Sequence, residues 1–293
     1  MSYQAYVSIV RTLYSHAKLI AVERLTGGVS ADVHRLDLKL QDGSFLSLVV
    51  REHGSRHCGH DVELEYKLLQ SLYTRGLPVP KPLLVDCSAR ILENPFLVMS
   101  FIEGSSVIAI EQSGSRIDAM AETLARIHAV STEGLPALPM RTDPLPEVLD
   151  FLPADREWNN LRDCLRSLTA TDYLETPKLL HGDYWPENIL WSSGAVAGIL
   201  DWEDSAIGDP LSDVATCCVE LRYLFGKASM RCFTQAYARY RSIDHQRLAL
   251  WLVYVAAAAQ CFMGDWGLDA ARENHMRSEA LSSIREAAAQ LMD

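Results

Sequence analysis

The chain of 293 residues contains 48% hydrophobic and 22% charged residues, which argues against collagen-like, coiled-coil and intrinsically disordered proteins. Its 27 lysines and arginines are outnumbered by 38 aspartates and glutamates, so the formal net charge is -11. An acidic chain repels the phosphate backbone of nucleic acids, and we therefore expect no nucleic-acid partner.

The seven cysteines are an odd number without a CxxC pair, a pattern typical of reduced thiols, so we expect a cytoplasmic protein. The opening segment, MSYQAYVSIVRTLYSHAK, lacks the basic start and apolar run of a signal peptide. The apolar stretch from Leu248 to Met263 is short for a membrane span and contains Gln260. It predicts a buried helix and no membrane partner; no feature of the sequence indicates an oligomeric state.

Strand patterns dominate the first hundred residues. In chain order, the expected elements are a helix at 3–16, strands at 19–25, 33–40 and 45–51, a helix at 61–73, and strands at 83–85 and 96–101. The Asp42-Gly43 turn between two apolar runs is typical of a hairpin. Gly76 and the prolines after it end the second helix.

Helical patterns dominate after Gly104. The expected helices lie at 117–130, 147–168, 210–225, 228–241, 245–263 and 268–291. A strand-rich front and a helix-rich back indicate an α+β protein with two lobes. We expect a small β-rich lobe at residues 1–102 and a larger helical lobe at residues 103–293.

The segment LLHGDYWPENIL, residues 179–190, has the spacing H-x-D-x-x-x-x-N of the protein-kinase catalytic loop. It contains His181, Asp183 and Asn188. Asp183 is the candidate for accepting the proton of an attacking hydroxyl group. Asn188 supplies an uncharged oxygen that suits Mg²⁺, and His181 is expected to be a scaffold of the loop.

A second carboxylate follows in AGILDWE, where an apolar run predicts a strand that ends at Asp201. A carboxylate at this point can bridge metal ions on the phosphates of a nucleotide. The Ser-Ser-Gly turn between the two segments predicts a hairpin that places Asn188 and Asp201 side by side. In GDPLSDVA, Asp209 is expected to cap a helix, and Asp213 to brace the catalytic loop.

HGDYWPEN followed by ILDWEDSAIGDPLSDVA resembles the aminoglycoside phosphotransferase family. This resemblance is specific in the two blocks and extends more weakly over nearly the whole chain. It implies a two-lobed, protein-kinase-like fold with ATP, or GTP, bound between the lobes and Mg²⁺ on its phosphates.

The resemblance also implies a phosphate-covering turn in LTGGVS, residues 25–30. Gly27 and Gly28 would let backbone N–H groups approach phosphate oxygens, and Ser30 would add a hydroxyl. By itself a Gly-Gly pair fits an ordinary turn equally well. The segment is not the GxGxxG loop of protein kinases, and the chain contains no Walker A motif.

Arg51 stands at the end of the third strand, where protein kinases have the lysine that binds the α- and β-phosphates. An arginine keeps the charge and forks well to phosphate. The resemblance implies that its partner is Glu65, in ELEYKLL; taken alone, Glu65 also fits a solvated position on a helix.

The run PFLVMSFIEG, residues 95–104, resembles the hinge between the lobes. The resemblance implies that adenine bonds to backbone groups near Ser100 and Ile102; an ordinary buried strand fits the composition as well. Glu203 lies either behind the metal ligands or simply beyond a strand. A cluster of metal-binding residue types has a spacing that matches no known ligand pattern: His53, His57, Cys58 and His60.

These features predict an ATP-dependent phosphotransferase that moves the γ-phosphoryl group to a hydroxyl of a small molecule. The acceptor stays open: an aminoglycoside, choline, homoserine, a macrolide and an unassigned metabolite all fit. The alternative is a nucleotide-binding pseudokinase that acts as a regulator, and its one sequence support is Arg51 in place of lysine.

Overall fold

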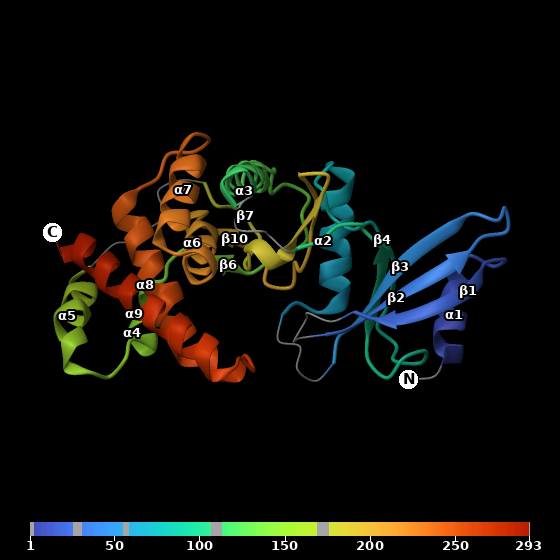
Figure 1. Ribbon diagram of the computed structural model, residues 1–293, viewed down its shortest axis with the longest axis horizontal. Helices are drawn as coiled ribbons and strands as arrows, with labels where there is room; N and C mark the ends of the chain where they lie inside the picture. The colour runs from blue at the N-terminus through green and yellow to red at the C-terminus, as the bar shows by residue number, and fades with distance from the viewer. Residues whose placement is uncertain (1–2, 26–30, 55–58, 107–112, 169–175, 293) are drawn as a thin grey trace.

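The computed structural model of the chain describes residues 3–25, 31–54, 59–106, 113–168 and 176–292. An N-terminal part built on an antiparallel sheet adjoins a larger, mainly helical C-terminal part (Figure 1). The predicted α+β class is therefore confirmed, and the division at residue 102 stays a prediction.

The N-terminal sheet contains five antiparallel strands in the order β1-β2-β3-β5-β4. The elements of this part are α1 (Tyr3–Leu13), β1 (Lys18–Arg24), β2 (Asp32–Lys39), β3 (Phe45–Glu52), α2 (Val62–Thr74), β4 (Pro82–Asp86) and β5 (Phe96–Ser100). Each of them was expected from the sequence, with ends that differ by a few residues.

The alternation of side chains along β3 decides which residue reaches the site, because successive residues of a strand point to opposite faces. Leu48 and Val50 lie in a core with α1. Val49 packs against the other core, and Arg51 points the same way, toward α2. Leu97 on β5 pairs with Arg51 and lies in that second core. An arginine thus emerges from an apolar sheet face.

Helix α2 supplies the partner for this arginine. It begins where the Asp61 carboxylate accepts a hydrogen bond from the N–H of Leu64, at 2.8 Å. Glu65, Leu68 and Leu72 recur at helical spacing, and all three are buried. Glu65 is therefore a carboxylate on an apolar stripe, where burial without a cation would be costly.

The C-terminal part is built from helices of very different lengths. They are α3 (Ser113–Ile127), α4 (Leu145–Phe151), α5 (Asn159–Ser167), α6 (Leu211–Phe225), α7 (Lys227–Ala238), α8 (His245–Phe262) and α9 (Ala270–Met292). The expected helical stretch at 147–168 was wrong in one respect. It is divided into α4 and α5 by residues 152–158, which include Pro153 and a 3-10 turn at Arg156–Trp158.

Two small sheets support the loops between these helices. The hairpin of β8 (Ile189–Ser192) and β9 (Ala195–Ile199) was expected. A three-stranded sheet of β6 (Met140–Arg141), β10 (Ala206–Gly208) and β7 (Lys178–Leu180) was not. Strands of two or three residues are too short to show an alternating pattern, so the sequence carried no signal for them.

Helix α8 with the turn that follows it, His245–Asp265, is the one helix of the described ranges that is long and apolar enough to cross a membrane. In this fold it packs against α4, α6 and α9. Leu248, Trp251 and Val253 lie in the core of the C-terminal part. Core packing thus accounts for its apolar residues, as the sequence predicts for a buried helix.

Candidate active site

A cleft of about 480 Å³ is lined by residues of both parts of the chain. Its apolar lining includes Val33 and Val49 from the sheet, and Leu190 and Leu200 from the β8–β9 region. Charged and amide side chains line it as well: Arg51, Glu65, Asn188 and Asp201. This combination can hold a ligand that joins a flat apolar group to an anionic one.

The loop after β7 is fixed by the buried ring of His181. Burial lowers the pKa of His181 to about 4, so the ring is neutral. Nε2 lies 2.9 Å from the carbonyl oxygen of Leu200 and donates to it. Nδ1 then accepts from the N–H of Asp183, at 3.3 Å. His181 therefore orients the backbone of Asp183, in keeping with the scaffold role expected for it.

The carboxyl group of Asp183 has the properties of a group that exchanges protons near neutrality. Its Oδ2 accepts from Asn188 Nδ2 at 2.9 Å and from Trp185 Nε1 at 3.2 Å. Burial, together with the charges of Asp201 and Asp204, raises the pKa of Asp183 to about 7. A group poised in this way suits general-base chemistry.

Asn188 and Asp201 lie beside each other at the open end of the β8–β9 hairpin, as predicted. The N–H of Leu200 donates to the carbonyl of Asn188 at 2.8 Å. Asn188 Nδ2 donates to Asp183, which leaves its Oδ1 for a cation. Asp201 adopts a φ of 63°, a left-handed conformation that costs energy in a residue with a Cβ and that clusters at functional sites.

The amide oxygen of Asn188 and the carboxylate of Asp201 are hard donors, and they fit Mg²⁺. Among the described residues, no group of three or more His, Cys, Asp and Glu side chains is arranged to hold a metal ion. Mg²⁺ commonly takes one or two protein ligands and completes its shell with water and phosphate oxygens. The two residues therefore suit an ion that arrives with a nucleotide.

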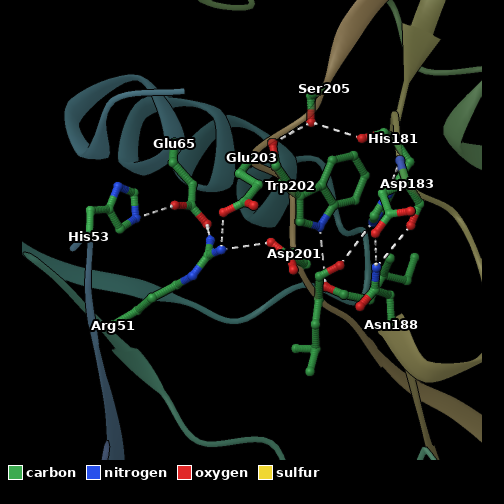
Figure 2. A network of polar contacts seen from close by, with 12 residues as sticks. Arg51, His53, Glu65, His181, Asp183, Asn188, Asp201, Trp202, Glu203 and Ser205 are labelled. Carbon is green, nitrogen blue, oxygen red and sulfur yellow. Dashed lines mark hydrogen bonds and ion pairs between the residues drawn. The ribbon is translucent and has the colours of Figure 1, made fainter. Parts of the chain in front are cut away.

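Arg51 is surrounded by carboxylates (Figure 2). Its Nη1 lies 2.6 Å from Glu65, and its Nη2 lies 2.7 Å from Asp201 and also contacts Glu203. His53 Nε2 lies 3.0 Å from the second oxygen of Glu65. Burial alone would lower the pKa of Arg51, but the three carboxylates raise it, so the guanidinium stays charged.

The contacts of Arg51 settle two questions that the sequence left open. Glu65 is a buried partner of the arginine and not a solvated helix residue. Glu203 is buried against the same guanidinium. The available signal for Glu203 was its place two residues after Asp201. Of the cluster of metal-binding residue types, His53 bonds to Glu65 and His60 to Ser205, while His57 and Cys58 lie outside the described residues.

Ser100 and Ile102, which were predicted to lie at a hinge, line the cleft. The N–H of Ser100, however, already donates to the carbonyl of Lys81 at 2.9 Å, and the Ser100 hydroxyl accepts from the N–H of Lys81. The N–H of Phe101 donates to Ser47. Ser100 therefore has no free N–H for adenine. The remaining predicted residues, Gly27, Gly28 and Ser30, lie outside the described residues.

Asp213 on α6 braces the loop that follows β7. Its two carboxylate oxygens accept from the N–H of His181, at 2.7 Å, and from the N–H of Gly182, at 3.0 Å. His128 Nε2 lies 3.1 Å from Asp213, and His128 Nδ1 lies 2.7 Å from the Tyr237 hydroxyl. Burial alone would raise the pKa of Asp213, but hydrogen bonds from His128 and the loop hold it below its ordinary value.

Replacing Asp213 by alanine is expected to lower the free energy of unfolding by about 3 kcal/mol, because buried N–H groups would lose their acceptor. Urea unfolding monitored by circular dichroism measures this loss. Asp163→Ala, at a side chain that is 75% exposed, is the control and should be nearly neutral. A loss below about 1 kcal/mol for Asp213→Ala would contradict the bracing role.

Known proteins resemble this chain in sequence and in fold. The sequence pattern of the phosphotransferase enzyme family matches residues 21–251. The acyl-CoA dehydrogenase family member 11 of Pongo abelii is 28% identical over 178 residues, which cover 53% of this chain and 22% of that protein. The chain thus spans about a fifth of the length of such relatives.

A shorter relative is matched along most of its length. The homoserine kinase of Methylobacterium sp. (strain 4-46) is 25% identical over 238 residues, which cover 74% of this chain and 72% of that protein. In structure, a Ralstonia eutropha JMP134 protein considered an aminoglycoside phosphotransferase superposes with a TM-score of 0.76 at 17% identity, covering 99% of this chain and 98% of the other. The chain belongs to the phosphotransferase enzyme family, and its fold is the protein-kinase-like fold of the aminoglycoside phosphotransferases.

Proposed function

We propose that the chain transfers the γ-phosphoryl group of ATP to a hydroxyl group of a small molecule, with Mg²⁺ as the cofactor. The observation that carries this proposal is the cluster of Asp183, Asn188 and Asp201, in which a carboxyl group of raised pKa lies beside two oxygen donors. Arg51 is proposed to steady the phosphates together with the turn at Gly27 and Gly28. GTP is the second nucleotide to test.

In the proposed reaction, the acceptor oxygen attacks the γ-phosphorus. The bond to the β–γ bridging oxygen breaks, ADP leaves with the electron pair, and Asp183 takes the hydroxyl proton. Asn188 Nδ2 and Trp185 Nε1 orient the receiving carboxylate. When bound, Mg²⁺ would neutralise charge on the phosphates, held by Asn188 and Asp201. The protein thus contributes mainly positioning and charge stabilisation.

A transfer assay tests the proposal. ADP release from Mg·ATP is measured with L-homoserine, choline, kanamycin, a macrolide and simple sugars, beside an Asp183→Ala control. We expect release that depends on one acceptor and is lost in the control. Tight Mg·ATP binding without transfer to any acceptor would favour the nucleotide-binding regulator. Absence of nucleotide binding would contradict both functions.

We also propose that the protein acts in the cytoplasm, without nucleic-acid or membrane partners.

The pH profile of kcat/KM for the nucleotide should rise through the pKa of Asp183, which burial and neighbouring carboxylates raise to about 7. A base must be deprotonated to act, so kcat/KM should fall about tenfold per pH unit below this pKa and level off above it. Steady-state rates between pH 5.5 and 8.5 measure the profile. The residual rate of Asp183→Asn should show no break near neutrality; the same break in that variant would assign it to another group.

A further inference from the structure

One nitrogen of the Arg51 guanidinium contacts two carboxylates instead of one (Figure 2). Nη1 is bound by Glu65 at 2.6 Å, whereas Nη2 is shared between Asp201, at 2.7 Å, and Glu203. An Nη nitrogen carries two N–H groups and can donate to both carboxylates at once. If one of these two partners leaves, the other still holds Nη2.

The two carboxylates on Nη2 differ in their access to the cleft. The side chain of Asp201 is 31% exposed and lines the cleft. The side chain of Glu203 is 9% exposed, and it is not among the described residues that line the cleft. A ligand or metal ion that enters the cleft can therefore meet Asp201, while Glu203 remains buried against the arginine.

The backbone around Glu203 is held from the N-terminal part of the chain. Its carbonyl accepts from the N–H of His60 at 2.8 Å. A Cβ added to Gly59 would lie 2.6 Å from the Cβ of Glu203, so the two segments are in close contact. The His60 ring also lies 2.6 Å from the carbonyl oxygen of Ser205. The backbone of Glu203 is thus held in place by the segment that precedes α2.

The charges around Arg51 favour a move of Asp201 from the arginine to a divalent cation. Three carboxylates face one guanidinium, which leaves an excess of two negative charges if all are ionised. A divalent cation at Asp201 would offset this excess. Asp201 would then give up the arginine, and a planar guanidinium whose two nitrogens both need partners would be left half bound without a further carboxylate.

We propose that Glu203 is a positioning residue that keeps Arg51 directed at the phosphates when Asp201 passes from the arginine to a metal ion. The inference rests on the proposed nucleotide-binding function. A lysine has a single side-chain nitrogen, and Glu65 is sufficient to hold it in place. The arginine at this position therefore requires Glu203, and the two residues act as a pair.

A double-mutant cycle of Glu203→Gln and Arg51→Lys tests this pairing. The dissociation constant of AMP-PNP is measured by calorimetric titration at saturating Mg²⁺ for the unaltered chain, both single variants and the double variant. Glu203→Gln should weaken binding about tenfold beside the arginine, but less than about threefold in the Arg51→Lys background. In kinetics, the loss should lie mainly in KM for Mg·ATP.

The control is Glu279→Gln, which removes a carboxylate 2.7 Å from the buried Arg222; neither residue is among the described residues that line the cleft. It should leave the affinity unchanged. Glu203→Asp keeps the charge one methylene farther from Arg51, and is the second variant if Glu203→Gln folds poorly; it should lose about threefold.

Equal losses in both backgrounds would overturn the pairing and assign Glu203 to the metal ion itself. An unchanged affinity in Glu203→Gln would also overturn it, while leaving the proposed function intact. If the unaltered chain does not bind Mg·AMP-PNP, the proposed function fails and the inference fails with it.

Discussion

Replacing Asp183 by alanine should lower kcat by roughly 10²–10⁴-fold, the contribution usual for a positioned general base. The structure gives the reason. The Asp183 carboxylate is oriented by Asn188 and Trp185, and burial raises its pKa to about 7. In the proposed mechanism, alanine removes both the base and the group that orients the hydroxyl of the substrate toward the γ-phosphorus. KM for the nucleotide should change little, because Asp183 is not among the described residues that line the cleft.

Steady-state kinetics with the acceptor found in the transfer assay measure this effect. Circular dichroism and the midpoint of thermal unfolding must show that the variant is folded, which we expect since the main braces of the loop are Asp213 and His181. Asp163→Ala controls for the loss of an aspartate at an exposed position. A kcat within about threefold of the unaltered enzyme would remove Asp183 from the mechanism.

Replacing Asp201 by alanine should weaken Mg²⁺-dependent nucleotide binding by roughly 100-fold or more. Among the proposed protein ligands, the metal ion would keep only the amide oxygen of Asn188, and Arg51 would lose one of its three carboxylates. Binding of the nucleotide without metal should not weaken, because the change removes a negative charge from a cluster that already carries an excess of them.

Calorimetric titration with AMP-PNP, once with Mg²⁺ and once with EDTA, separates these two effects. The unaltered chain should bind much more tightly with Mg²⁺, and this difference should nearly vanish in Asp201→Ala. Asp201→Asn is the matched variant, since it keeps the shape and one oxygen donor, and it should retain part of the Mg²⁺ dependence. An undiminished Mg²⁺ dependence in the alanine variant would place the metal ion elsewhere.

The sequence alone was enough to predict the helices and strands whose hydrophobic pattern extends over about ten consecutive residues. The strands and helices of the N-terminal part follow from alternation, helical spacing and turn residues within windows of about ten residues. The same holds for the triad of oxygen donors. Asp183 and Asn188 are five residues apart, and a short hairpin brings Asp201 beside them. Local chain geometry therefore places these three side chains together before the rest of the fold is known.

Contacts between residues far apart in the chain were decided by tertiary packing. Arg51 meets Asp201 across 150 positions of the chain and Glu203 across 152, and only the docking of the sheet on the helical part brings them into contact. The hydrogen bonds of Asp213 to the loop after β7 and the sheet of β6, β10 and β7 also join separate segments. Such contacts depend on the summed packing of whole elements, and local preferences do not encode it. The sequence by itself thus determined the fold class and the proximity of Asp183, Asn188 and Asp201, whereas tertiary structure decided the environment of Arg51 and the role proposed for Glu203.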